Sequence, residues 1–199
     1  MDLDRATTDH EVVAVAPAWT LGAYRGQGVT QDLRHVPGAA LDGNLDYADS
    51  RETAIFARRD IVTPDWLAWT GRATGAPVRA QAVVTAYSAS GLARNRAVAV
   101  DWRAAIAPSV GAGLSVEVAF GVGWWHAFGT PWYNHGGNRE WDGKYHNLLH
   151  VVPELSLRHG ALPGWSLGVR IDHESGFYGA FAPAALGTNH VGFVLARDL

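Results

Sequence analysis

The feature that most limits the fold of this chain is an alternation of side-chain types between residues 114 and 124. Every second residue is apolar, and those between are small or polar: Leu114, Val116, Val118, Phe120, Val122 and Trp124 against Ser115, Glu117, Ala119, Gly121 and Gly123. A period of two places the two sets on opposite faces of a β-strand. The eleven residues match a strand that crosses a bilayer, whereas globular strands most often have about five or six.

The same alternation returns at 98–106, 149–158, 165–174 and 191–195, so the sequence predicts an all-β fold. Nine segments qualify as strands: 18–25, 51–59, 65–74, 79–88, 96–106, 113–126, 147–158, 164–176 and 188–196. Bacterial single-chain membrane barrels close with an even number of strands. We therefore predict an antiparallel up-and-down β-barrel of eight strands. Either 65–88 is then one interrupted strand, or the segment before residue 50 lies outside the barrel.

Alternation alone fits two kinds of barrel that bury opposite faces. A membrane barrel turns its apolar face to lipid, whereas a soluble lipocalin-like barrel turns it inward. Strand length favours the membrane-embedded form, as do tryptophans near strand ends, where an aromatic girdle would lie: Trp19, Trp102, Trp124, Trp125 and Trp165. Short turns at 75–78, 107–112 and 159–163 also alternate with long connections at 127–146 and 177–188, as in outer-membrane barrels.

The length of 199 residues suits a single domain over 1–199. We expect residues 1–17 to be an N-terminal extension. Residues 26–50 show no periodicity and are predicted to form a loop or a short helix. The first twenty residues carry five charges and no apolar core segment, so we expect no signal peptide in this chain.

Composition excludes several classes of protein. A charged fraction of 18% with 48% hydrophobic residues excludes a disordered chain, and a net charge of -3 gives no reason to expect nucleic acid as a partner. The absence of cysteine excludes disulfides and thiolate metal sites. His146 and His150 are four residues apart, which on a strand separates them by about 13 Å, too far to share a metal. We expect no metal and no cofactor.

One pair of residues points to chemistry. His173 and Ser175 lie on one face of a strand. The same face carries Val169 and Ile171, so the two polar side chains stand at the end of an apolar row. An imidazole beside a hydroxyl is the minimum for a nucleophile activated by a base, and this face would meet a water-insoluble ester in the membrane. A purely structural interpretation is that the pair marks the headgroup boundary of the bilayer. The residues alone leave both interpretations open.

Four stretches of the C-terminal half resemble the acyloxyacyl hydrolase family of Gram-negative outer membranes, whose characterised members are lipid A 3-O-deacylases. They are Pro-Glu-Leu-Ser-Leu-Arg at 153–158, Gly-Trp-Ser-Leu-Gly-Val-Arg at 164–170, His-Glu-Ser-Gly at 173–176 and Gly-Thr-Asn at 187–189. The resemblance implies an eight-stranded outer-membrane barrel with a lipid-facing His-x-Ser motif. Carried over by position, Ser175 is the nucleophile and His173 the base.

The chain departs from this family at two points. The family usually has Asn directly after the serine, where this chain has Gly176, and a Glu about a dozen residues later. Between residues 177 and 188 this chain has no carboxylate, and the phase of Asp172 and Glu174 turns them to the lumen. We expect Asn189 to orient the imidazole and the Gly176 amide to donate to the oxyanion. Loss of an orienting acid can lower a rate by on the order of 10⁴-fold.

Two functions therefore stay open. The first is an outer-membrane esterase that removes an acyl chain from lipid A or a related lipid, with membrane lipid or lipopolysaccharide as its partner. The second is a catalytically weak or inactive outer-membrane barrel with a structural or interaction role, which would bind a protein partner or a second copy of the chain.

Overall fold

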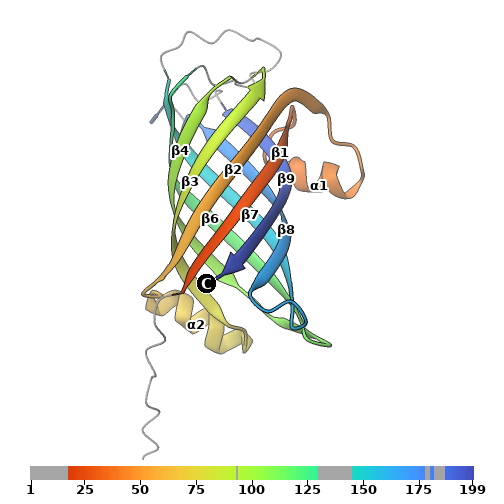
Figure 1. Cartoon of the computed structure of the whole chain (residues 1–199), viewed down its shortest axis with the longest axis vertical. Coiled ribbons are helices and arrows are strands. Elements are labelled where there is room, and N and C mark those ends of the chain that lie inside the picture. Colours follow the sequence, from red (N-terminus) through yellow and green to blue (C-terminus); the bar gives the residue numbers. More distant parts are fainter. Residues whose placement is uncertain (1–17, 93, 130–144, 178–179, 182–186) are drawn as a thin grey trace, which may run out of the picture.

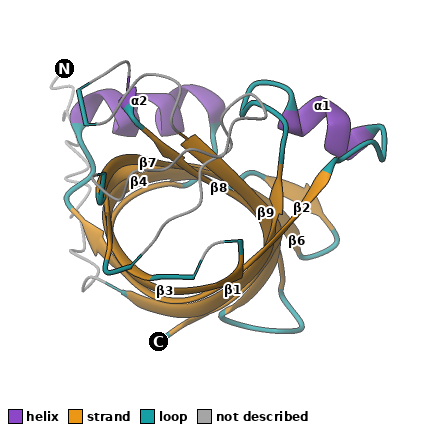
Figure 2. Ribbon diagram, turned by 90° about the horizontal axis from the view of Figure 1, so that it is seen from above, coloured by secondary structure: helices purple, strands orange, loops and turns teal. Residues whose placement is uncertain are grey.

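In the computed structural model the described residues are 18–92, 94–129, 145–177, 180–181 and 187–199. They form a closed antiparallel barrel of eight long strands (Figure 1). These strands are β1 (Trp19–Val29), β2 (Tyr47–Ile61), β3 (Val78–Gly91), β4 (Arg96–Ile106), β6 (Leu114–Ala127), β7 (Asn147–His159), β8 (Trp165–Ser175) and β9 (Gly187–Asp198). Each pairs with its neighbour along the chain, and pairing of β1 with β9 completes the ring seen from above in Figure 2. A short strand, β5 (Ser109–Gly111), forms a hairpin with β6.

The prediction of a strand over 65–74 is wrong, because this segment is the helix α2 (Asp65–Thr74). Pro64 directly precedes it, Asp65 favours its N-terminus, and Gly75 ends it in the left-handed region at φ 66°. Both explanations offered for the ninth candidate strand are therefore wrong as well. The barrel has eight long strands since 65–74 leaves the wall and the segment of β1 belongs to it.

The two ends of the barrel differ in their connections. One end, called here the α1 end, carries the connection of β1 to β2 with the helix α1 (Val36–Leu41), and the connections at 128–146 and 176–186. The other, the α2 end, carries α2 and the short turns at 107–113 and 160–164. The predicted alternation of short and long connections holds from β4 to β9 and fails before it. The connection from Ile61 to Val78 at the α2 end is long because it contains α2, and the connection from Gly91 to Arg96 at the α1 end is short. Within 26–50, β1 extends to Val29, α1 follows, and β2 begins at Tyr47. Residues 1–17 lie outside the described residues, so the predicted N-terminal extension and the single domain over 1–199 stay predictions.

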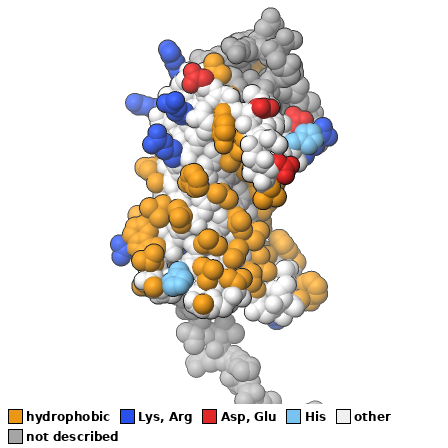
Figure 3. Space-filling view, turned by 90° about the vertical axis from the view of Figure 1, so that its right-hand side faces the viewer, with side chains coloured by type: hydrophobic (Ala, Val, Ile, Leu, Met, Phe, Trp, Pro, Cys, Tyr) orange, Lys and Arg blue, Asp and Glu red, His pale blue; other side chains and the backbone are white. Residues whose placement is uncertain are grey.

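The two faces of the wall carry opposite kinds of side chain. Apolar side chains point outward and are half or more exposed on several strands: Ile55, Val84, Val100, Val118, Phe120, Leu167 and Phe193. Charged and polar side chains point inward and are buried: Glu52, Arg58, Arg103, Glu117, Glu154, Arg170 and Asp172. Figure 3 shows hydrophobic side chains spread over the wall, with most charged ones toward the α1 end. This arrangement is that of a membrane barrel, and the lipocalin-like alternative is wrong.

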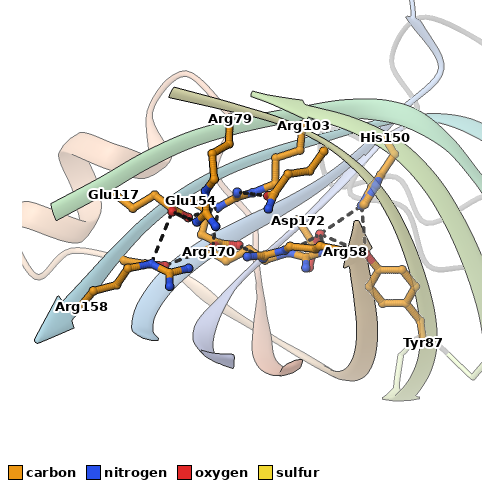
Figure 4. Close-up of polar contacts among 12 residues, drawn as sticks. Arg58, Arg79, Tyr87, Arg103, Glu117, His150, Glu154, Arg158, Arg170 and Asp172 are labelled. Atoms are coloured by element: carbon orange, nitrogen blue, oxygen red, sulfur yellow. Dashed lines mark hydrogen bonds and ion pairs between the residues drawn. The ribbon is translucent and has the colours of Figure 1, made fainter. Parts of the chain in front are cut away.

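Ion pairs fill the lumen (Figure 4). Glu154 accepts hydrogen bonds from Arg58 at 2.5 Å and from Arg103 at 3.0 Å, and Arg103 continues to Glu117 at 2.7 Å. Nearer the α1 end, Arg170 pairs with Asp172 at 2.6 Å. Because these groups are buried and bonded to one another, the interior is a packed polar core.

Tryptophans mark both rims of the wall, with one exception to the prediction. Trp19 and Trp165 are exposed near the α2 end, and Trp124 is exposed near the α1 end. Trp66 of α2 packs against Trp102, with 6.0 Å between the ring centroids. Trp125 points into the lumen and is buried, so its predicted place in the girdle is wrong. Adjacent residues on a strand point to opposite faces, and Trp124 already points outward. No helix in the described part of the chain is long and apolar enough to cross a membrane.

Candidate active site

The candidate site lies on the outward face of β8 and β9, near the α1 end. His173 and Ser175 are half-buried on this face, and strand pairing sets His173 opposite Asn189. Asp172 and Glu174, which alternate with the two candidate residues, are fully buried on the lumen side. Neither carboxylate can therefore orient the His173 ring, and that task falls to a group on the outward face.

A chain of hydrogen bonds fixes the orientation of His173. The Asn189 amide donates from Nδ2 to the main-chain carbonyl of Gln31 at 2.7 Å. This bond assigns the other end of the amide, Oδ1, as the atom that lies 2.7 Å from His173 Nδ1. An amide oxygen only accepts, so Nδ1 carries the proton and Nε2 keeps its lone pair. His173 is thus held in the tautomer that a general base requires.

Ser175 is two residues further along the same strand face. Its Cα is about 6.6–6.8 Å from that of His173 along a strand, and side chains lean along the strand direction. In the structure the Ser175 Oγ accepts a hydrogen bond from the Phe177 N–H at 3.1 Å, and among the described residues no hydrogen bond joins it to the imidazole. The structure therefore brings the candidate base, His173, into contact with Asn189, and places the Ser175 hydroxyl on the same face beside them.

A strained turn follows the serine. Phe177 has φ 47°, in the left-handed region that non-glycine residues rarely adopt. The Gly176 carbonyl accepts a hydrogen bond from the Phe181 N–H at 3.1 Å, which closes this turn. Backbone strain of this kind concentrates at functional sites. The role of the Gly176 amide as an oxyanion donor stays a prediction.

No protein-family model matches this chain, and no curated protein matches it. Solved structures do match. The outer membrane enzyme PagL is 13% identical over 88% of this chain and 97% of its own, with a TM-score of 0.51. Neisserial surface protein A is 8% identical over 91% and 95%, with a TM-score of 0.47. The N-terminal β-barrel domain of Pseudomonas aeruginosa OprF is 9% identical over 91% and 97%, with a TM-score of 0.43.

The chain has the fold of an outer-membrane β-barrel. At this level of identity the likeness establishes the fold alone, so the chemistry must be argued from the residues.

Two features of this outer-membrane barrel were missed from the sequence. The Gln31 carbonyl belongs to the connection after β1 and lies 158 residues from Asn189, and a main-chain acceptor leaves no signature in a sequence. The second feature is a buried cluster on the lumen side, where Glu52, Glu174 and His190 bring one potential ligand atom each within 4.8 Å of one another. They come from β2, β8 and β9, so no spacing rule connects them.

His146 and His150, the two histidines four residues apart in the sequence, each contact other groups in the structure. His150 is fully buried between Asp101 at 2.7 Å and Asp172 at 3.0 Å. His146 lies with its Nδ1 3.1 Å from the Ala127 carbonyl oxygen.

Proposed function

We propose that this chain is an outer-membrane carboxylic ester hydrolase that cleaves an acyl chain from a membrane lipid. The observation that carries the proposal is the 2.7 Å contact of His173 Nδ1 with Asn189 Oδ1, beside Ser175 on the outward wall. A lumen site would admit only soluble substrates, whereas a site on this wall meets lipid directly. The resemblance of residues 153–189 to the acyloxyacyl hydrolases supports lipid A as the substrate.

The reaction follows from the positions of the three side chains. His173 Nε2 takes the proton of the Ser175 hydroxyl as Oγ attacks the ester carbonyl. The Gly176 N–H donates to the oxyanion of the tetrahedral intermediate. The imidazolium returns the proton to the departing sugar or glycerol oxygen, which leaves an acyl group on Ser175. Water, activated by the same imidazole, then releases the fatty acid. Asn189 holds the ring throughout.

The location that this function requires is the outer membrane of a Gram-negative bacterium. The fold shared with the outer membrane enzyme PagL supports it. Membrane fractions extracted with detergent test it directly, because a closed barrel resists denaturation in the cold and shifts on a gel after boiling. Recovery of the chain in the soluble fraction would contradict the location.

The experiment that tests the activity is mass spectrometry of lipid A after the purified full chain acts on lipopolysaccharide in detergent micelles. The expected result is loss of one acyl chain by the wild type and none by Ser175→Ala. Ser88→Ala is the matched control, because Ser88 is an exposed serine of β3 away from the site. Defined phospholipid esters serve as a second substrate. Unchanged lipid profiles with both substrates would contradict the enzyme proposal. Cleavage by both the wild type and Ser175→Ala would show that Ser175 is not the nucleophile.

A second candidate is a catalytically inactive barrel that contacts other proteins or lipids. The lack of a hydrogen bond between Ser175 Oγ and the His173 ring among the described residues favours it, since Oγ only accepts a bond from the Phe177 N–H. The same mass spectrometry separates the two candidates.

A further inference from the structure

We propose that the lumen of this barrel holds a divalent transition-metal ion between Glu52, Glu174 and His190. The three side chains are at most 2% exposed, and each offers a ligand atom within 4.8 Å of the other two. They belong to β2, β8 and β9 near the α1 end of the barrel.

The two carboxylates lack the partners that all other buried carboxylates of the described residues have. Asp101 contacts His150, Asp172 contacts Arg170, and Glu117 and Glu154 contact arginines. Glu52 and Glu174 make no ion pair within the described part of the chain. Three of their four carboxylate oxygens, Glu52 Oε1 and both of Glu174, are buried without a hydrogen bond.

Two unpaired carboxylates that face each other in a buried site are costly. Each loses its hydration and repels the other. Among the described residues no cation pairs with either of them, and Arg170, which is paired with Asp172, acts on both only from a distance. A divalent cation between them removes both penalties. The alternative, a proton shared by the two carboxyl groups, makes a different prediction for metal binding and is an outcome of the test below.

His190 is prepared as a ligand. Its Nε2 lies 2.9 Å from the buried Ser50 Oγ, whereas its Nδ1 is buried without a partner. Histidines that bind metals almost always donate their other ring N–H to a neighbouring acceptor, which fixes the tautomer. With Ser50 in that position, Nδ1 presents its lone pair to the cation.

Two glycines lie in the strand between the ligands. β1 lies between β2 and β9, and its lumen-facing positions at this level are the buried residues Gly26 and Gly28. Gly26 is in register with Glu52, and Gly28 with His190. The hydroxyl end of the buried Tyr24 side chain lies over Gly26, where a Cβ would be, and Glu52 still comes within 4.8 Å of His190 and Glu174.

The donor set indicates which ion fits. Two carboxylate oxygens and one imidazole nitrogen suit Zn²⁺ or Mn²⁺, whereas Ca²⁺ and Mg²⁺ favour oxygen alone. Three protein ligands leave a fourth position to water. Glu174 stands between His173 and Ser175 in β8, and His190 follows Asn189 in β9. The ion would thus tie together, from the lumen side, the two strands that carry the candidate active site.

Zn²⁺ binding to the detergent-solubilised full chain, first treated with a chelator, tests the proposal without any lipid substrate. Equilibrium dialysis with elemental analysis should give one tightly bound Zn²⁺ per wild-type chain. Loss of a second-shell partner weakens metal binding by about 10–100-fold, so loss of a ligand in Glu174→Gln or His190→Gln should weaken it by at least about 100-fold.

A matched control tests whether a pair of histidines outside the lumen binds the Zn²⁺ instead. The rings of His126 and His146 lie 6.3 Å apart near the α1 end and could bind Zn²⁺ weakly. His126→Ala should keep the tight site. Tight binding that is lost in His126→Ala, or kept in Glu174→Gln, would overturn the proposal.

If Glu174→Gln does not fold, thermal unfolding of the wild type and of Glu52→Gln tests the proposal instead. Zn²⁺ should raise the melting temperature of the wild type and the chelator should lower it, since a ligand that binds only the folded state stabilises it. Glu52→Gln should lose this response. Equal melting temperatures of the wild type in Zn²⁺ and in chelator would mean that the carboxylates share a proton instead.

Discussion

His173 and Asn189 face each other across β8 and β9 with 2.7 Å between Nδ1 and Oδ1, and the Gln31 carbonyl holds the far end of the amide. Where esterases commonly place a carboxylate beside the histidine, this barrel has a neutral amide whose orientation depends on a connection far along the chain. The amide fixes the tautomer of the ring but supplies no charge to stabilise the imidazolium.

Replacement of Asn189 by leucine should therefore lower the rate of ester cleavage while substrate binding persists. The ring loses its orientation, so we expect kcat to fall by about 10²–10⁴-fold with KM unchanged. Steady-state kinetics on a micellar ester measures both constants. Ser88→Ala is the control, since Ser88 is exposed on β3, three strands away from β9. A rise in KM with kcat unchanged would show that Asn189 binds substrate instead.

Glu154→Gln should destabilise the barrel strongly. Glu154 is buried and bonds to Arg58 and Arg103, so its loss leaves two guanidinium groups without their shared partner. Breaking a buried pair costs about 3–5 kcal/mol. Urea unfolding in lipid vesicles measures the change. Asp32→Asn, which removes the exposed partner of Arg34, should change stability by less than about 0.5 kcal/mol. Equal effects of the two variants would argue against a packed polar lumen.

A charge introduced on the outward wall should be costly in proportion to its depth. Phe120 points outward near the middle of β6, so Phe120→Arg should cost about 2–4 kcal/mol in a bilayer. Val110 lies at the rim in β5, and Val110→Arg should cost about 0–1 kcal/mol. The same unfolding assay compares the two variants. An equal cost at the rim and in the middle would show that the bilayer does not lie where this prediction places it.

Gly123→Ala should destabilise β6. A methyl group there would overlap the Val100 carbonyl oxygen and the Asp101 carboxylate, and overpacking typically costs about 1–3 kcal/mol. Gly38→Ala in α1 meets no atom within 4 Å and should be neutral or stabilise the helix by about 0.5–1 kcal/mol. Opposite signs in the unfolding free energies of the two variants are the expected outcome.

The strands of the barrel wall can be predicted from this sequence, whereas some of the connections between them cannot. Alternation such as that of 114–124 reports which side chains share a face, and it predicts the strands because every strand of a membrane barrel has two different environments. It fails at 65–74, where Trp66 and Trp69 follow the spacing of an exposed helix face and Pro64 and Gly75 mark the ends.

The site is predictable only where its residues lie close in the chain. Alternation places His173 and Ser175 on one face, and resemblance supplies their roles. The support from Gln31 and the meeting of Glu52 with Glu174 depend on which strands become neighbours and on their register. A single sequence does not contain that information, since pairing between distant strands follows from closure of the whole sheet.

The bond between Arg58 and Glu154 has a consequence for assembly. It joins β2 to β7, which stand four places apart in a ring of eight and thus on opposite walls. A sheet that has not yet curled shut keeps these two charges apart, each in need of water. Curling the sheet shut removes the water and supplies the partner in the same step. An incompletely closed ring would therefore be poorly tolerated in lipid, and insertion should proceed without a long-lived open form.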